Sequence, residues 1–160
     1  MAQVSRPSNY GAAHQSPQMI VVHSMGEYVA DESGGYMHAV DFLDRQGLSA
    51  HALVSPDGTL YRCRDDAQGA YHARGFNAAS LGIEVLVKGR HDYGSFASAI
   101  SKPYLTPEQY EAVVAQCREW VRAYGITRVV RHSELSPGRK VDPGAGFPWF
   151  NFLRDIGVRK

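Results

Sequence analysis

The clearest strand signal in the chain is the segment Leu81-Gly82-Ile83-Glu84-Val85-Leu86-Val87. Successive side chains of a strand point to opposite faces, so the odd-numbered residues, all apolar, share one face and Glu84 lies on the other. A carboxylate in such an apolar run either lies on a solvated face or stands inside a pocket. Inside a pocket, burial would raise the pKa of Glu84 towards the range of a general base. The pattern alone leaves both alternatives open.

Four other segments are typical of strands. Residues 19–23 and 127–132 are short runs that each end in a histidine, His23 or His132. Residues 50–55 and 59–64 flank the sequence Pro56-Asp57-Gly58, whose early proline and late glycine predict a hairpin turn.

Helices are predicted over residues 36–46, 106–124 and 147–156. The second has the strongest signals: Thr106 can cap it, Pro107 suits its first position, and Gln109 can complete a capping box. Gly125 ends it. Residues 65–79 and 88–105 are predicted to be loops. Strands and helices therefore interleave around one sheet, which indicates an α/β or mixed α+β class with a single central mixed sheet flanked by helices.

The length and composition indicate one globular domain. The chain has 160 residues, of which 44% are hydrophobic and 21% are charged, and its net charge is +1. We expect an N-terminal arm over residues 1–17 and a single domain over residues 18–160. The charge gives no reason to expect nucleic acid as a partner, and no stretch reaches the roughly 18 apolar residues of a membrane span. Residues 1–17 lack the features of a secretory signal, which predicts synthesis in the cytoplasm.

Three polar residues suggest a metal site. His23 and His132 both stand where an apolar strand runs out, and Asp142 precedes a proline that favours an extended backbone. In an extended segment, Lys140 lies on the same side as Asp142. Two imidazoles and one carboxylate suit a tetrahedral zinc ion whose fourth position is left for water. The alternative is that the histidines are ordinary surface or core residues, since they lie too far apart for a short local metal motif.

A family resemblance rests on five blocks that occur in a fixed order. They are Ile20-Val21-Val22-His23; Ser49-Ala50-His51-Ala52-Leu53-Val54 with Asp57-Gly58; Tyr71-His72-Ala73; Asn77-x-x-Ser80-x-Gly82-Ile83-Glu84; and Arg131-His132-x-x-Leu135-Ser136-Pro137-Gly138-Arg139-Lys140-Val141-Asp142-Pro143-Gly144. Together they resemble the zinc-dependent N-acetylmuramoyl-L-alanine amidases of the type 2 family, which share the fold of peptidoglycan recognition proteins. The resemblance covers about residues 18–153.

The resemblance implies a role for each matching position. His23, His132 and Asp142 match the ligands of one zinc ion per chain. Glu84 matches the catalytic acid–base carboxylate of the branch that resembles recycling amidases, and Lys140 matches a lysine that stabilises the transition state.

Three other matching positions are less specific. His72 matches a pocket histidine for which substrate contact and support of a ligand are both open, and Asn77 matches a residue at the pocket edge that touches the muramyl-peptide. His51 is expected to be structural or to support the site from behind. His14, His38 and His91 are expected at the surface.

Three functions follow from this resemblance. The first is a phage-type endolysin, a monomer that acts on peptidoglycan of the cell wall after release from the cytoplasm. The alternative is a cytoplasmic amidase of cell-wall recycling that acts on soluble anhydro-muropeptides. A non-catalytic peptidoglycan-binding protein is the third, although such proteins usually lose a zinc ligand and this chain has all three. Neither nucleic acid nor a membrane is expected as a partner.

Overall fold

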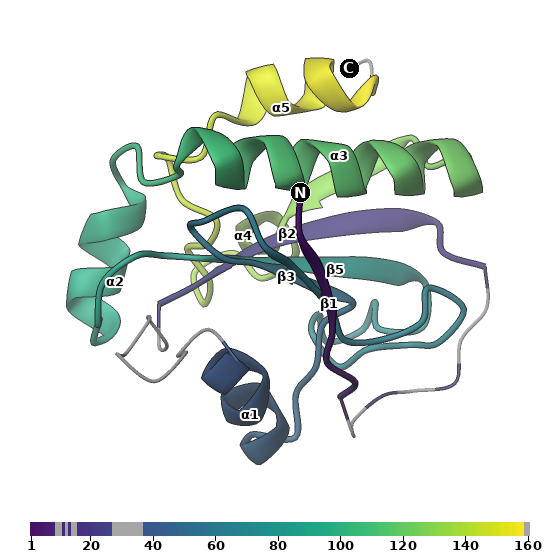
Figure 1. The fold of residues 1–160 in the computed structure, drawn as a ribbon, viewed down its shortest axis with the longest axis horizontal. Coiled ribbons are helices and arrows are strands. Elements are labelled where there is room, and N and C mark those ends of the chain that lie inside the picture. Colours follow the sequence, from purple (N-terminus) through teal and green to yellow (C-terminus); the bar gives the residue numbers. More distant parts are fainter. Residues whose placement is uncertain (9–10, 12, 14–15, 27–36, 159–160) are drawn as a thin grey trace.

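A mixed sheet of six strands forms the centre of the molecule, in the order β1-β4-β3-β5-β2-β6 (Figure 1). The computed structural model describes residues 1–8, 11, 13, 16–26 and 37–158. The strands are Gln3–Ser5 (β1), Met19–Met25 (β2), Ala52–Val54 (β3), Leu60–Arg62 (β4), Ser80–Leu86 (β5) and Arg128–Arg131 (β6). β3 and β4 form the predicted antiparallel hairpin, and the other neighbouring strands pair in parallel.

The parallel strands β5, β2 and β6 bring distant polar residues to one place. β2 lies between the other two, and His23 of β2 stands opposite Glu84 of β5. On the other side Val22 stands opposite Arg131, so His132 follows at the level of His23. Because parallel strands end at the same edge of a sheet, these side chains lie next to one another at the carboxyl ends, where sheet proteins bind ligands.

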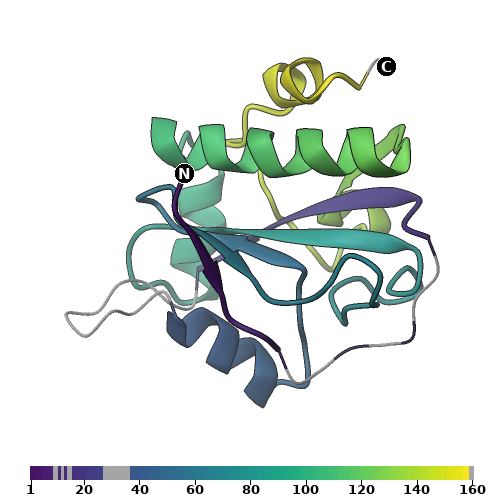
Figure 2. The same ribbon diagram turned by 45° about the vertical axis from the view of Figure 1, so that its right-hand side comes forward.

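Helices cover both faces of the sheet (Figures 1 and 2). α3 (Pro107–Tyr124) crosses one face, and α5 (Trp149–Ile156) packs on the outer side of α3. α1 (Met37–Arg45) covers the opposite face. Two shorter helices, α2 (Tyr93–Ile100) and α4 (His132–Leu135), complete the fold. The predicted class, a mixed sheet flanked by helices, is confirmed. None of the helices within the described ranges has the length and apolar composition needed to cross a membrane.

The alternation of side chains along β2 and β5 decides which face carries the polar residues. Val22 and Ile83 point into the core cluster beneath α3, together with the fully buried Trp120. The next residues, His23 and Glu84, point to the opposite face, because successive side chains alternate. The polar residues of the central strands therefore lie on the side of the sheet that α1 covers.

The predicted ends of α3 are confirmed, but one detail of the prediction is wrong. The hydroxyl of Thr106 accepts a hydrogen bond from the backbone N–H of Gln109 at 3.0 Å, and Gly125 ends the helix with φ 63°. The side chain of Gln109 does not close a capping box. It is buried and donates to the backbone carbonyls of Val54 at 2.9 Å and Leu86 at 2.8 Å, so it ties α3 to β3 and β5.

Three other predictions of local structure need correction. The segment 88–105 is not all loop, because it contains α2, which begins where the Asp92 side chain accepts from the N–H of Ser95 at 2.8 Å. The predicted N-terminal arm over residues 1–17 contains a strand, because β1 pairs with β4 at the edge of the sheet. His132 is the first residue of α4 and not the last residue of a strand. The predicted start of the first helix, residue 36, and His14 lie outside the described residues, as does the side chain of His38.

Two phenylalanines of α5 offer a matched test of this packing. Phe152 lies on the inner side of α5 and is 0% exposed, whereas Phe150, on the outer side of the same helix, is 68% exposed. We expect Phe152→Ala to lower the free energy of unfolding by about 3–5 kcal/mol, because it removes a buried ring and leaves a cavity. Phe150→Ala should change it by no more than about 0.5 kcal/mol. Urea denaturation of the two variants measures both values, and equal effects would contradict this packing.

Candidate active site

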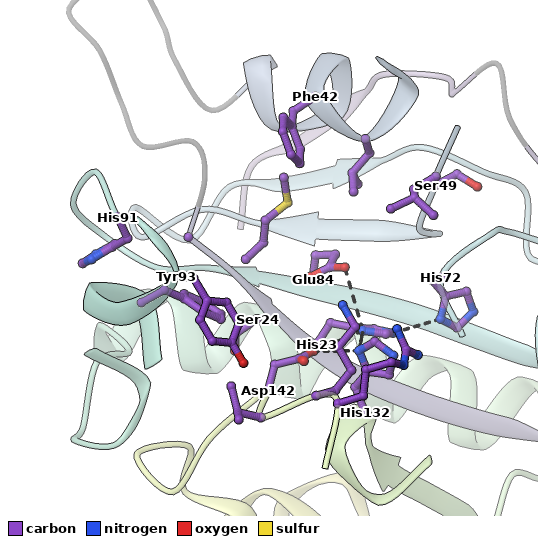
Figure 3. A pocket seen from close by; sticks show the side chains of 18 of the residues that line it. His23, Ser24, Phe42, Ser49, His72, Glu84, His91, Tyr93, His132 and Asp142 are labelled. Carbon is purple, nitrogen blue, oxygen red and sulfur yellow. Dashed lines mark hydrogen bonds and ion pairs between the residues drawn. The ribbon is translucent and has the colours of Figure 1, made fainter. Parts of the chain in front are cut away.

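Three side chains converge at the carboxyl edge of the sheet (Figure 3). The Nδ1 atoms of His23 and His132 are 3.0 Å apart, and the Oδ2 atom of Asp142 lies 3.0 Å from His132 Nδ1 and 3.3 Å from His23 Nδ1. All three residues are buried. His23 and His132 are 109 positions apart in the sequence, and the parallel pairing of β2 with β6 brings their imidazoles together.

The spacing of these three atoms fits a tetrahedral metal ion. Nitrogen and oxygen ligands at about 2.0–2.1 Å from such an ion lie about 3.3 Å from one another. The three measured separations, 3.0 to 3.3 Å, are close to this value. Two nitrogen donors and one oxygen donor on one side of an ion would leave the coordination position that faces the cavity open for another ligand. His23, His132 and Asp142 could therefore hold one ion.

The protonation states of His23 and Asp142 suit this role. Burial lowers the pKa of His23 below its usual value, although Asp142 opposes the shift, so the imidazole is neutral near pH 7. Burial raises the pKa of Asp142, but the hydrogen bond with His132 and the nearby imidazole of His23 outweigh that effect and hold the pKa below its usual value. Metal ions bind neutral imidazole and ionised carboxylate.

The loop that carries Asp142 is fixed from two sides. The backbone N–H of Ser133 donates to the carbonyl of Asp142 at 3.0 Å. The hydroxyl of Tyr104 donates to the carbonyl of Pro143 at 3.0 Å and is itself hydrogen-bonded to Ser24 of β2. The carboxylate is therefore held relative to β2, the strand that carries His23.

Glu84 lies beside the three convergent residues. One oxygen of its carboxylate is 3.9 Å from His23 Nδ1, and only 11% of its side chain is exposed, so the solvated-face alternative is excluded. Burial raises the pKa of Glu84 to about 8, with a further contribution from Asp142, and Lys140 opposes the shift. A carboxyl group with a pKa in this range can both accept and return a proton near neutral pH.

A cavity of about 270 Å³ opens above these residues. Lys140 and His72 line it, as do His23, Glu84, His132 and Asp142. Its other wall comes from α1 and α2 and is largely aromatic. It includes Phe42, Tyr93 and Phe96, and His91 next to α2 also lines the cavity. Such a mixture of apolar walls and a few convergent polar groups is typical of ligand sites.

The wall of the cavity that α2 contributes was not predicted, because residues 88–105 have the composition of a loop. The signal that could have revealed it is the Asp92-x-x-Ser95 pattern at the start of the helix, a common N-cap arrangement. His91, expected at the surface, is half-buried at this wall.

The remaining predicted residues have other positions. His51 is buried between two backbone groups: its Nδ1 accepts from Gly82 N–H at 3.0 Å and its Nε2 donates to the carbonyl of Gln68 at 2.8 Å. Asn77 is not among the residues that line the described cavity. Its side-chain oxygen accepts from the N–H groups of His72 at 3.1 Å and Ala73 at 2.8 Å, so it shapes the loop that carries His72.

His72 contacts the imidazole of His23 directly. Its Nδ1 lies 2.9 Å from His23 Nε2, and its Nε2 lies 3.1 Å from the hydroxyl oxygen of Ser80. Burial, and next the neighbouring His23 and His51, lower the pKa of His72 well below its usual value. His72 is therefore neutral near pH 7.

Known proteins share this sequence pattern and this fold. The family model described as N-acetylmuramoyl-L-alanine amidase (Amidase_2) matches residues 13–145. The 1,6-anhydro-N-acetylmuramyl-L-alanine amidase AmpD of Enterobacter cloacae is 25% identical, and the alignment covers 86% of this chain and 80% of AmpD.

Two solved structures superpose closely on the chain. The endolysin N-acetylmuramoyl-L-alanine amidase LysCS from Clostridium intestinale has a TM-score of 0.76 and 24% identity, covering 98% of this chain and 96% of its own. The amidase AmiD of Escherichia coli, solved with the substrate anhydro-N-acetylmuramic acid-L-Ala-D-γ-Glu-L-Lys, has a TM-score of 0.73 and 22% identity, covering 97% of this chain and 62% of its own. Because the family model spans most of the residues that build the sheet and the convergent site, the chain belongs to the Amidase_2 family of N-acetylmuramoyl-L-alanine amidases.

Proposed function

We propose that the protein is a zinc-dependent amidase that hydrolyses the bond between the lactyl group of N-acetylmuramic acid and L-alanine. The observation that carries the proposal is the triangle of His23 Nδ1, His132 Nδ1 and Asp142 Oδ2 with sides of 3.0 to 3.3 Å, which opens into the same cavity as the Glu84 carboxylate. A zinc ion held by these three residues would lower the pKa of a bound water and polarise the amide carbonyl.

Glu84 is placed to move the proton. The carboxylate takes a proton from the attacking water and then delivers it to the nitrogen of the leaving alanine. Its burial and its pKa of about 8 support both steps, since a carboxyl group with this pKa can change its protonation state near neutral pH. In many members of the family that the sequence resembles, a tyrosine stands just before the histidine at position 51. Residue 50 is alanine here, so Glu84 is assigned the whole of this proton transfer.

Lys140 supplies a positive charge to the same cavity. Negative charge develops on the carbonyl oxygen as the amide becomes tetrahedral, and an ammonium group that is already in place stabilises it. The compact ammonium of lysine acts as a point charge and needs no particular orientation. We assign Lys140 to transition-state stabilisation, in agreement with its match to the family lysine.

For the biological role we propose an endolysin-type enzyme that acts on intact cell-wall peptidoglycan. The likeness to LysCS over 98% of this chain and 96% of that chain supports this role. Recycling of soluble anhydro-muropeptides in the cytoplasm is the second candidate, and the match to AmpD favours it. In both roles we propose that one zinc ion and one chain suffice.

Two substrates separate these roles. The protein is incubated with intact sacculi and, in parallel, with a soluble anhydro-muropeptide, and released peptide is measured. We expect release from sacculi that is lost when a chelator removes zinc and returns when zinc is added. Cleavage of the soluble fragment alone would favour recycling. Hydrolysis that persists after complete zinc removal would overturn the mechanism for both roles.

A further inference from the structure

We propose that His72 is a positioning residue that fixes His23 in the tautomer able to bind metal, and that it is not a substrate-binding residue. The proposal rests on the metal site of the proposed function. The observations that carry it are hydrogen bonds on the far side of the His23 ring, away from that site. These bonds run from His23 through His72 and Ser80 to the backbone carbonyl of Phe76.

The backbone carbonyl of Phe76, at the end of this series of hydrogen bonds, fixes the direction of each of them. The carbonyl of Phe76 can only accept, so the Ser80 hydroxyl donates its proton to it at 2.8 Å. The oxygen of Ser80 must then accept from His72 Nε2, which lies 3.1 Å away. A neutral imidazole with a proton on Nε2 has none on Nδ1. His72 Nδ1 is therefore an acceptor.

This arrangement of protons determines which nitrogen of His23 can bind a metal ion. His23 Nε2, 2.9 Å from the acceptor nitrogen of His72, must carry the proton of the His23 ring. The Nδ1 atom of His23 then keeps its lone pair, and this is the atom that lies 3.0 Å from His132 Nδ1 and 3.3 Å from Asp142 Oδ2. Hydrogen bonds to the far nitrogen of a ligating histidine commonly set its tautomer and strengthen metal binding.

Three contacts hold the His72 ring in the required place. Asn77 accepts the N–H groups of residues 72 and 73, which fixes the backbone below the ring. His51 packs edge-on against it, with ring centroids 5.8 Å apart. Gly82 lies under the ring, and a Cβ atom at this position would stand 2.5 Å from His72 Nδ1. The absence of a side chain at Gly82 therefore gives the ring the space in which it meets His23.

The first test compares two replacements of His72 by their affinity for zinc, measured by competition with a chromophoric chelator. His72→Phe keeps a ring but removes the acceptor, and we expect zinc affinity to fall about 10- to 100-fold. His72→Asn places a carboxamide oxygen near the position of Nδ1, and we expect it to recover most of that loss. His91→Phe, which changes a histidine of the same cavity outside the hydrogen-bond chain, is the matched control and should leave zinc affinity unchanged.

The second test reads the tautomer directly in the metal-free protein. Long-range ¹H–¹⁵N correlation of the imidazoles should show His23 protonated on Nε2 in the wild type and a mixture of tautomers in His72→Phe. Thermal unfolding of the metal-free variants identifies any loss of affinity that comes from misfolding. Ser80→Ala removes the next group in the series of hydrogen bonds after His72, and it should also weaken zinc binding.

The outcomes separate this proposal from the proposed function. Unchanged zinc affinity in a folded His72→Phe variant, or a raised KM with unchanged affinity, would overturn the positioning role and leave the zinc enzyme intact. A wild-type protein that binds no zinc would instead overturn the proposed function itself. The tautomer of His23 in the metal-free protein would remain measurable in that case. It would still test whether His72 fixes the proton of His23 on Nε2.

Discussion

The His132→Ala variant is expected to lose at least about 10³-fold in kcat/KM. The change removes one of three donors and leaves two, which cannot hold the ion in the geometry that the triangle provides. A catalytic metal contributes several kcal/mol to the transition state, and about 4 kcal/mol corresponds to a factor of 10³. Rates on a soluble muropeptide, measured together with the zinc content of the purified protein by plasma emission spectroscopy, check this value.

Chelator treatment of the wild type provides the control. The stripped wild type should regain full activity when one equivalent of zinc is added, whereas His132→Ala should not. Full activity of a His132→Ala protein that contains no zinc would remove the metal from the mechanism. Full zinc content with a lost rate would show that His132 acts in some way other than as a ligand.

The second large effect is expected for Glu84→Gln. Glutamine keeps the size and the hydrogen-bonding capacity of the side chain but cannot take a proton, so we expect kcat to fall about 10²- to 10⁴-fold. Zinc content and KM should change little, because Glu84 is not among the three convergent donors and the loss concerns the transition state. Steady-state kinetics with zinc analysis of the same samples measure all three quantities.

Glu134→Gln is the matched control for this substitution. Glu134 lies in α4 near the site, but its side chain is 46% exposed and pairs with Arg131 outside the cavity. We expect its kcat to stay within about twofold of the wild type, as is usual for surface changes. A Glu84→Gln variant with wild-type turnover would remove Glu84 from the proton transfer and require another base.

The architecture was predictable to a large extent because its strongest elements carry local signals. The apolar run around Glu84 and the capped helix that follows Thr106 were both recognisable from neighbouring residues alone. The amidase class was predicted from the blocks of sequence and is confirmed by the family model. α2 was not predicted because its eight residues include one glycine, Gly94, two serines, Ser95 and Ser98, and two alanines. Such a composition is typical of a loop.

The candidate site was only partly predictable, for a physical reason. The sequence places His23 and His132 at the ends of apolar runs, but it does not give the register of β5, β2 and β6, and the register decides whether Glu84 faces the same cavity. The roles of His51 and Asn77 depend on which backbone groups lie opposite them. Those partners belong to segments whose proximity arises only in the folded chain.

The register of β5, β2 and β6 also governs how the metal would act on folding. His23 and His132 are separated by 109 positions, so an unfolded chain holds no preformed pair of imidazoles. An ion that binds the native state alone would stabilise it by about 1.4 kcal/mol for each tenfold rise in free zinc above the dissociation constant. A slip of one residue between β2 and β5 would turn His23 and Glu84 to opposite sides of the sheet. Zinc would therefore favour the correct strand pairing, since its binding energy is gained only by chains in which these strands have paired in the native register.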